Sequence, residues 1–343
     1  MGIACPPTCG YGHGAAWLRL MGTDSHRRLA NQAVLQIRLF GPTVVLTDGA
    51  NTQVSELGGV KPRQILEILA ANPGTPVTKD RLADLLWDGE PPKSYVGTLE
   101  SYVCVLRRRL GLGPGRKSPL ATTSNGYLLD PASGSVDLSE FRRLVGMATT
   151  ARPAQGLRLT QEAVALLSGE LLASEAYASW ARSERENFQR DVVEACGRAA
   201  QNAHTVHDFD AAASMSRLAI SYDSMAEDAY QHLMRALSAS GRGSQAIRAY
   251  FDLRTAMVTD LGMEPGPVTR ALFMDILCAG GEHDAPSRIG TGRDNAEVTN
   301  LRLLHNALES ITGVKLPTFD GPLAGMAERV LRSGLTLTCR EVA

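Results

Sequence analysis

The sequence predicts a mainly α-helical protein with a small β component, in which a mixed N-terminal part precedes a longer helical part. Three observations predict this class. Short alternating segments typical of strands fall within residues 35–57 and 120–129. Apolar residues elsewhere recur at three- and four-residue steps, the period of one helix face, as far as residue 277. A similarity at a 34-residue period lies within the second helical stretch.

Length and composition limit the class of protein further. A chain of 343 residues with 44% hydrophobic residues is long enough for roughly two to three domains with real cores. No run of about 18 apolar residues and no basic segment followed by an apolar stretch occurs, so we expect no membrane association and a cytoplasmic location. The sequence has no serine–histidine–acid order, nucleophile elbow or HExxH motif, so we expect that it is not an enzyme.

No metal site or cofactor is expected. The six cysteines form no CxxC pair, and His204 and His207, three residues apart, have no further recognisable ligand. The glycine-rich stretch 111–118 superficially resembles a phosphate-binding loop. That loop needs a glycine directly before its lysine, and here Arg116 precedes Lys117.

The first elements of the chain are short. Residues 1–33, rich in glycine, alanine and small polar residues, are expected to be a disordered tail. Two strands are predicted at 36–40 and 43–46, separated by a Gly-Pro pair, and a third is suggested at 52–57.

Two helices then precede the central one. Residues 61–71 carry an apolar helical stripe and stop at an Asn-Pro-Gly sequence. Thr78 is predicted to be the N-cap of a second helix, because its hydroxyl can accept a hydrogen bond from an exposed amide of the first turn. The apolar face of that second helix would be formed by Leu82, Leu85, Leu86 and Trp87.

The central stretch, residues 92–129, predicts a helix with a basic end, a glycine-rich turn and a β-hairpin. The buried face of the helix would consist of Leu99, Val103, Leu106 and Leu110. The opposite face would carry Thr98, Ser101, Val105 and Arg108, with Arg107 and Arg109 beside it. The hairpin, 120–123 and 127–129, would turn at Asn125-Gly126, where we expect positive φ angles.

Charge is concentrated in this stretch. Between Lys93 and Tyr127 there are six basic residues and one acid, Glu100, although the net charge of the chain is −1. Local positive charge is what phosphate binding requires. Strands, three helices and a hairpin in this order describe a winged helix over residues 34–131, with the third helix able to lie in a major groove.

The N-terminal part resembles the SARP family (Streptomyces antibiotic regulatory proteins), whose N-terminal module is a winged helix of the response-regulator type found in two-component effectors. The resemblance covers about a hundred residues, in order. It is carried by Leu39-Phe40-Gly41-Pro42, Pro62-Arg63-Gln64, Leu82-Ala83-Asp84-Leu85-Leu86-Trp87, Pro91-Pro92, residues 98–110 and Gly126-Tyr127-Leu128-Leu129.

The helical part, residues 137–279, has the period of tetratricopeptide-like helix pairs. At 34-residue spacing, the matching pairs are Ala195 and Ala229, His207 and Gly241, Asp208 and Arg242, and Ala212 and Ala246. This part also resembles the bacterial transcriptional activation domain (BTAD) that follows the winged helix in SARPs. The resemblance is carried by residues 137–141, 180–185, 246–261 and the signature 261–267.

The resemblance implies a sequence-specific DNA-binding transcription activator of an antibiotic or other secondary-metabolite gene cluster. It further implies binding of double-stranded DNA at promoter direct repeats, as side-by-side protomers in a dimer or higher oligomer, and recruitment of RNA polymerase including its sigma factor. The predicted DNA-binding residues are Lys93, Thr98, Ser101, Tyr102, Val105, Arg107, Arg108, Arg109, Arg116, Lys117, Thr122, Thr123, Ser124 and Asn125.

Some positions depart from the family pattern and leave an alternative open. Glu100, Cys104 and Val105 stand where glutamine, serine and arginine are usual, and Ala121 and Thr123 replace common basic wing residues. The alternative is a tetratricopeptide-like protein-interaction adaptor with weak or lost specific DNA binding. Residues 280–343, a linker followed by two apolar helical stripes, are predicted to form a C-terminal helical extension.

Overall fold

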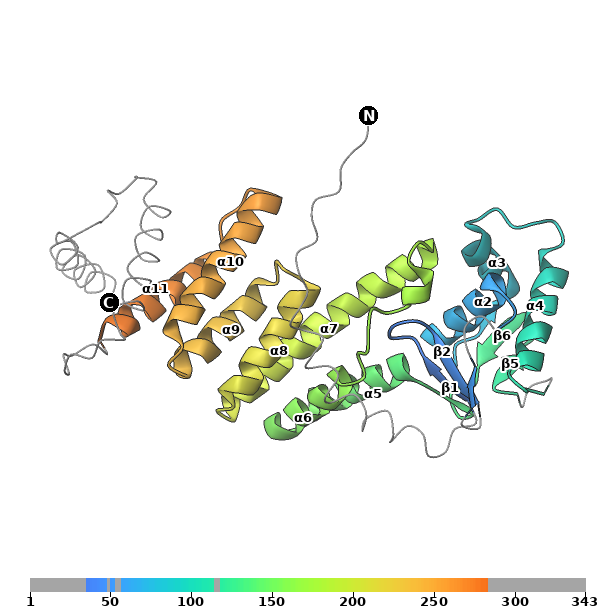
Figure 1. Ribbon diagram of the computed structural model, residues 1–343, viewed down its shortest axis with the longest axis horizontal. Helices are drawn as coiled ribbons and strands as arrows, with labels where there is room; N and C mark the ends of the chain where they lie inside the picture. Colours follow the sequence, from blue (N-terminus) through green and yellow to red (C-terminus); the bar gives the residue numbers. More distant parts are fainter. Residues whose placement is uncertain (1–34, 48–49, 53–56, 114–117, 283–343) are drawn as a thin grey trace. The chain divides into compact units, whose positions relative to one another are not determined.

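The computed structural model describes residues 35–47, 50–52, 57–113 and 118–282 (Figure 1). It divides into two compact units, residues 1–195 and 196–343, within the long helix α7 (Ser179–Thr205). The predicted tail 1–33 and extension 280–343 lie outside the described residues except for the end of the last helix. No helix of the described ranges is both long and apolar enough to cross a membrane.

The first unit begins with a four-stranded sheet of order β3-β2-β1-β7. Strands β1 (Leu35–Arg38), β2 (Val44–Thr47) and β3 (Ala50–Thr52) are antiparallel neighbours, as the alternating sequence suggests. Strand β7 (Gly134–Val136) comes from beyond the predicted hairpin and pairs with β1 in parallel. The sequence did not indicate β7, because its three residues show no alternation that marks a strand.

Three helices follow the first strands. They are α2 (Val60–Ala71), α3 (Lys79–Trp87) and α4 (Tyr95–Arg109), and they pack on one another through buried leucines and isoleucines. The predicted N-cap is confirmed, since the Thr78 hydroxyl accepts from the amide of Arg81 at 3.1 Å. Helix α3 ends at Asp88, whose left-handed φ of 51° turns the chain toward α4.

A second sheet of order β4-β6-β5 completes the winged helix. Strands β5 (Leu120–Thr122) and β6 (Gly126–Leu129) form the predicted hairpin, and β4 (Val77–Thr78) pairs with β6. The expected positive φ angles at the hairpin turn are wrong, because neither Asn125 nor Gly126 has one. Glycine at 126 serves a close approach instead: a Cβ there would collide with the carbonyl oxygen of Val77.

The helical part of the first unit is attached directly to this module. Helices α5 (Asp137–Thr150) and α6 (Pro153–Val164) and the short 3₁₀ helix η2 (Ala173–Glu175) precede α7. The buried carboxylate of Asp137 accepts hydrogen bonds from the amides of Leu39 (2.9 Å) and Phe40 (3.1 Å). Burial raises the pKa of Asp137 to about 6, although these backbone donors favour its ionised form.

A second group of buried polar residues joins α2 to η2. Glu175 accepts from Arg63 Nε (2.9 Å) and Gln64 Nε2 (2.6 Å). On the neighbouring turn, Glu67 is completely buried and accepts from the hydroxyl of Thr43. Burial, and after it the nearby charge of Glu175, raise the pKa of Glu67 to about 8, although the Thr43 hydrogen bond and the Arg63 charge lower it.

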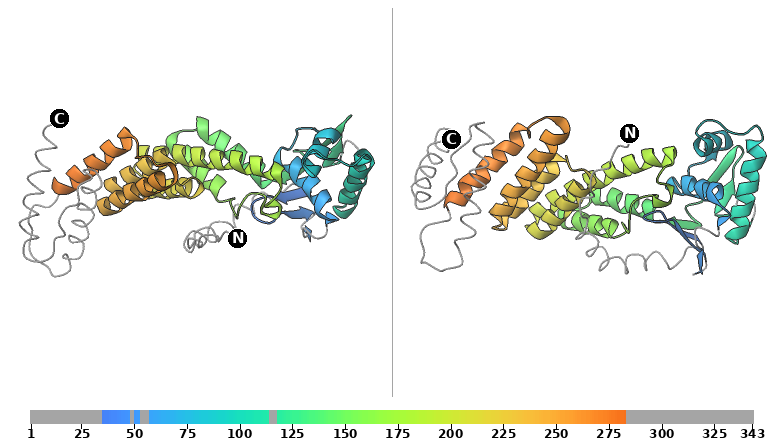
Figure 2. Two further views of the ribbon diagram at one scale, coloured as in Figure 1. Left: turned by 90° about the horizontal axis from the view of Figure 1, so that it is seen from above. Right: turned by 45° about the horizontal axis from the view of Figure 1, so that its top comes forward.

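The second unit consists of the end of α7 and helices α8 (Phe209–Tyr222), α9 (Glu227–Ala239), α10 (Gly243–Leu261) and α11 (Pro267–Glu282). Consecutive helices from α8 to α11 lie side by side (Figures 1 and 2). The 34-residue period corresponds to structure: His207 and Gly241 both have left-handed φ angles, 60° and 74°, at the turn before α8 and α10. Asp208 and Arg242 are the N-cap residues of those helices.

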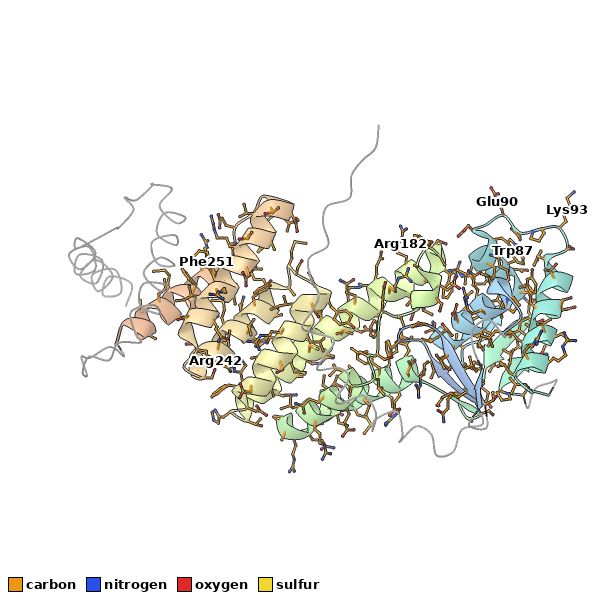
Figure 3. The ribbon with its side chains drawn as sticks, in the orientation of Figure 1. Trp87, Glu90, Lys93, Arg182, Arg242 and Phe251 are labelled. Atoms are coloured by element: carbon orange, nitrogen blue, oxygen red, sulfur yellow. The ribbon has the colours of Figure 1, made fainter. Side chains whose placement is uncertain are left out.

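The small residues of the repeat also occupy equivalent places. Ala212 and Ala246, near the starts of α8 and α10, are both completely buried, as expected where paired helices approach closely. An ion pair links the starts of α8 and α10, with Arg242 Nη2 donating to Asp210 Oδ1 at 2.7 Å. Figure 3 shows Arg242 at the N-terminal end of α10. The predicted fold class, a winged helix followed by a tetratricopeptide-like helical domain, is confirmed.

Candidate nucleic-acid interface

Helix α4 presents one buried and one exposed face. Leu99, Val103, Leu106 and Leu110 are at most 3% exposed and pack into the winged-helix core, as their spacing predicts. The exposed stripe opposite consists of Gly97, Glu100, Ser101, Cys104 and Arg108. Glu100 and Cys104, which depart from the family pattern, therefore lie on the outer surface of the helix.

The outer face differs by about one position from the face that the sequence suggested. Ser101 and Arg108 lie on it, while Thr98, Tyr102 and Val105 are half-buried on one flank. On that flank the loop before α2 comes close to the helix, because a Cβ on Gly58 would collide with the Val105 side chain. The helix therefore offers Val105 only partly to an outside ligand.

Two of the hydroxyl groups predicted to face DNA, both on α4, bond to their own helix in this structure. Ser101 Oγ donates to the carbonyl of Gly97 at 2.9 Å, and Thr98 Oγ1 donates to the carbonyl of Ser94 at 3.1 Å. Each hydroxyl keeps acceptor capacity for an outside donor. Such contacts satisfy the hydroxyl hydrogen and fix the side-chain rotamer without removing the group from the surface.

Arg107 connects α4 to the hairpin. Its Nη2 donates to the carbonyl of Leu120 (2.7 Å) and to Thr122 Oγ1 (2.8 Å), and its Nε donates to the same carbonyl (3.1 Å). The guanidinium carbon also lies 6.0 Å from the centre of the Tyr127 ring. Arg107 and Thr122 therefore bond to each other and join the helix to the wing. The sequence had suggested that each of them contacts DNA separately.

The remaining basic residues of the site differ in exposure and in contacts. Arg108 and Arg109 are exposed, and neither guanidinium group is bonded to any other described residue. Lys93 is also exposed, and Figure 3 shows it projecting outward from the loop between α3 and α4. Arg116 and Lys117 lie outside the described residues. The described cations thus occupy both ends of α4, a distribution suited to phosphates on either side of a groove.

The hairpin turn lies next to the N-terminus of α3. Ser124 and Asn125 are exposed, Thr122 and Thr123 are half-buried, and the turn closes through the amide of Thr123, which donates to the carbonyl of Gly126 at 2.9 Å. The amide of Lys79 donates to the carbonyl of Asn125, also at 2.9 Å. The wing tip is therefore fixed to both α3 and α4.

Sequence reasoning missed one residue of this surface, Lys79. Its ammonium group donates to Glu100 Oε1 at 2.6 Å, and this bond raises the pKa of Lys79. Glu100, the one acid among the basic residues of this stretch, therefore has a cationic partner. No local pattern indicates a contact between residues 79 and 100, because it depends on the packing of α3 against α4.

Comparison with known proteins agrees with this architecture. A family model described as "Transcriptional regulatory protein, C terminal" matches residues 58–129, and one described as "Bacterial transcriptional activator domain" matches residues 136–277. Regulatory protein DnrI of Streptomyces peucetius is 32% identical over 261 residues, which are 71% of this chain and 93% of DnrI. Regulatory protein AfsR of Streptomyces griseus is 28% identical over 264 residues, which are 75% of this chain and 26% of AfsR.

A solved structure is similar over most of the chain. The structure of Mycobacterium tuberculosis EmbR in complex with a low affinity phosphopeptide matches with a TM-score of 0.60 and 25% identity, over 82% of this chain and 71% of that chain. Fold, exposed helix and comparisons define the class: a DNA-binding transcriptional regulator, not an enzyme, with a winged helix and a bacterial transcriptional activator domain. Within that class, the chain belongs to the SARP family.

Proposed function

We propose that this regulator is a sequence-specific activator of an antibiotic or other secondary-metabolite gene cluster. In this proposal it binds direct repeats in a promoter as side-by-side protomers and recruits RNA polymerase, including the sigma factor. Its place in the SARP family and the presence of both modules support this role. The protein would act in the cytoplasm, where the promoter DNA and the polymerase are found.

The observation that carries the proposal is the outer face of α4. A helix that buries four apolar residues, exposes a polar stripe as far as Arg108 and carries the exposed Arg109 beside it has the shape and charge to enter a major groove. Arg109 and Lys93 would contact phosphates, and Ser101 and Arg108 would lie nearest to base edges, with Arg108 also able to reach the backbone. Ser124 and Asn125 at the wing tip would approach the adjacent minor groove or backbone.

The adaptor alternative depended on Glu100 and Val105, which appeared unfavourable for DNA binding. Two contacts in the structure weaken that argument. Glu100 is paired with Lys79, so its charge is balanced locally, and Val105 is half-buried beside Gly58, so it occupies little of the outer face. The activator is therefore the better supported of the two functions.

Footprinting of the full chain on promoters of its neighbouring genes tests the proposal. We expect protection of direct repeats at moderate salt, and an affinity that falls steeply as salt rises, because phosphate contacts release counterions. Arg108→Ala should abolish specific protection. Arg158→Ala, at an exposed position of α6, is the matched control and should leave protection unchanged. A folded protein that protects no repeat would instead support the adaptor.

Activation needs a separate measurement. Transcription reconstituted with purified RNA polymerase and its sigma factor, on a promoter that contains the protected repeats, should rise when the full chain is added. Removal of the repeats from the template should abolish the rise. Occupied repeats without any rise in transcript would contradict the activator role while leaving DNA binding intact.

A further inference from the structure

Lys79 and Glu100 form an ion pair on the candidate interface. Lys79 is the first residue of α3, and Glu100 lies on the outer stripe of α4. The ammonium nitrogen is 2.6 Å from Glu100 Oε1, and the Glu100 side chain remains 55% exposed. An outside ligand can therefore reach the carboxylate while the pair stays intact.

The surroundings hold the pair in place. The backbone amide of Lys79 is bonded to Asn125 at the wing tip, and the Thr78 hydroxyl caps the helix that begins at Lys79. About two turns further along α4, Arg107 fixes the helix to the wing through Leu120 and Thr122. Helix α3, helix α4 and the hairpin are therefore bonded to one another around the pair, and this fixes the spacing of its donor and acceptor groups.

The unused hydrogen-bonding groups of the pair have a definite chemical complement. Glu100 Oε2 makes no hydrogen bond within the described chain, so it can accept one. An ammonium group has three donor hydrogens, of which Glu100 takes one, so two remain. In the major groove a cytosine presents an amino donor, and the guanine paired with it presents the O6 and N7 acceptors. Glu100 Oε2 as acceptor and the Lys79 ammonium group as donor, side by side, therefore match the cytosine and guanine edges of one base pair.

We propose that Lys79 and Glu100 together read one C·G base pair, Glu100 accepting from the cytosine amino group and Lys79 donating to the guanine. This inference rests on the proposed binding of α4 in the major groove and assigns the base preference of one operator position. Lys79 has a second role in it, because its charge offsets the repulsion between Glu100 and the phosphates. A lone glutamate on this face would weaken binding to every sequence alike.

Selection of bound duplexes from a random-sequence DNA library by the full-length chain tests the pair. The wild type should select C·G at one position. Glu100→Gln should lose that preference by roughly ten-fold or shift it toward adenine, whose N6 and N7 suit a side-chain amide. Lys79→Gln should reduce the preference at the same position. The free energy of base discrimination lost in the double variant should be smaller than the sum of the losses in the two single variants, as expected for residues that act together.

Glu90→Gln is the matched control, because it removes one exposed carboxylate from the loop between α3 and α4 without touching the outer stripe (Figure 3). It should change affinity equally for all sequences. If Glu100→Gln behaves like Glu90→Gln, or only lowers the melting temperature, the inference is wrong while the proposed function stands. A wild-type protein that selects no sequence at all overturns both.

Discussion

The carboxylate of Asp137 accepts the backbone amide hydrogen of Leu39 at 2.9 Å, although the two residues are 98 positions apart in the chain. Asp137 is the first residue of α5, and Leu39 follows the first strand of the winged helix. One side chain thus satisfies the backbone at the end of β1, where the sheet can supply no further partner.

We expect Asp137→Ala to destabilise the first unit by about 2–4 kcal/mol, because buried amides, among them those of Leu39 and Phe40, lose their acceptor. Denaturant unfolding followed by circular dichroism measures the change. Asp260→Ala, at an exposed position near the end of α10, is the control and should alter the free energy of unfolding by less than about 0.5 kcal/mol. Equal losses in the two variants would contradict the assigned role.

Stability should fall as pH rises from about 4 to about 8. Asp137 and Glu67 both have a pKa that is raised by burial, to about 6 and about 8. In this window the folded protein therefore binds more protons than the unfolded chain, and deprotonation favours unfolding. Glutamine cannot ionise, so Glu67→Gln should flatten the upper part of this pH dependence. The free energy of unfolding of the variant, relative to that of the wild type, should therefore be higher at pH 8 than at pH 5.

Unfolding free energies of the wild type and of Glu67→Gln at pH 5 and pH 8 give this comparison. Glu162→Gln, on the surface of α6, removes a carboxylate that is 40% exposed and should leave the pH dependence as it is in the wild type. If the free energy of unfolding of the wild type instead rises steadily from pH 4 to pH 8, the pKa values of Glu67 and Asp137 are not raised in the folded protein and the prediction is wrong.

Arg107 and Arg109 should behave differently although they are two residues apart. Arg107→Met removes the bonds from α4 to Leu120 and Thr122, so amide hydrogen exchange in residues 120–129 should become faster by roughly ten-fold or more. Arg109→Met removes an exposed side chain that has no bonded partner in the described chain and should leave the exchange unchanged. The measurement needs no DNA, so it separates support of the wing from phosphate contact.

The backbone conformation at Gly241 should limit which residues can replace this glycine without loss of stability. Its φ of 74° is left-handed, a conformation that asparagine tolerates better than β-branched residues do. Gly241→Val should therefore cost about 1–2 kcal/mol more than Gly241→Asn in thermal or denaturant unfolding. Nothing lies within 4 Å of a Cβ at this position, so a collision cannot explain a difference between the two variants. Equal costs would show that the turn adjusts its backbone.

Local signals in the sequence predicted much of the structure. The cap at Thr78 and the buried stripe from Leu99 to Leu110 depend on neighbours within a few residues, and both are confirmed. The 34-residue register was also visible, because equivalent positions such as His207 and Gly241 meet the same backbone requirement in each repeat.

What the sequence missed depends on contacts between distant residues. Strand β7 pairs with β1 across about a hundred positions, and Lys79 meets Glu100 only because α3 packs against α4. The outer face of α4 was misplaced by about one position for the same reason. A helical period gives the buried stripe, but the neighbouring loop at Gly58 decides which flank is covered.

The parallel pairing of β7 with β1 bears on any exchange of parts between members of this family. A chimaera joined between the two family models, at residues 130–133, would take β7 and Asp137 from one parent and β1 from the other. Contacts with Glu175 would also be divided between the parents. A graft that transfers DNA specificity should therefore carry the donor sequence through η2, so that the sheet and the carboxylates that bond to it come from the same parent.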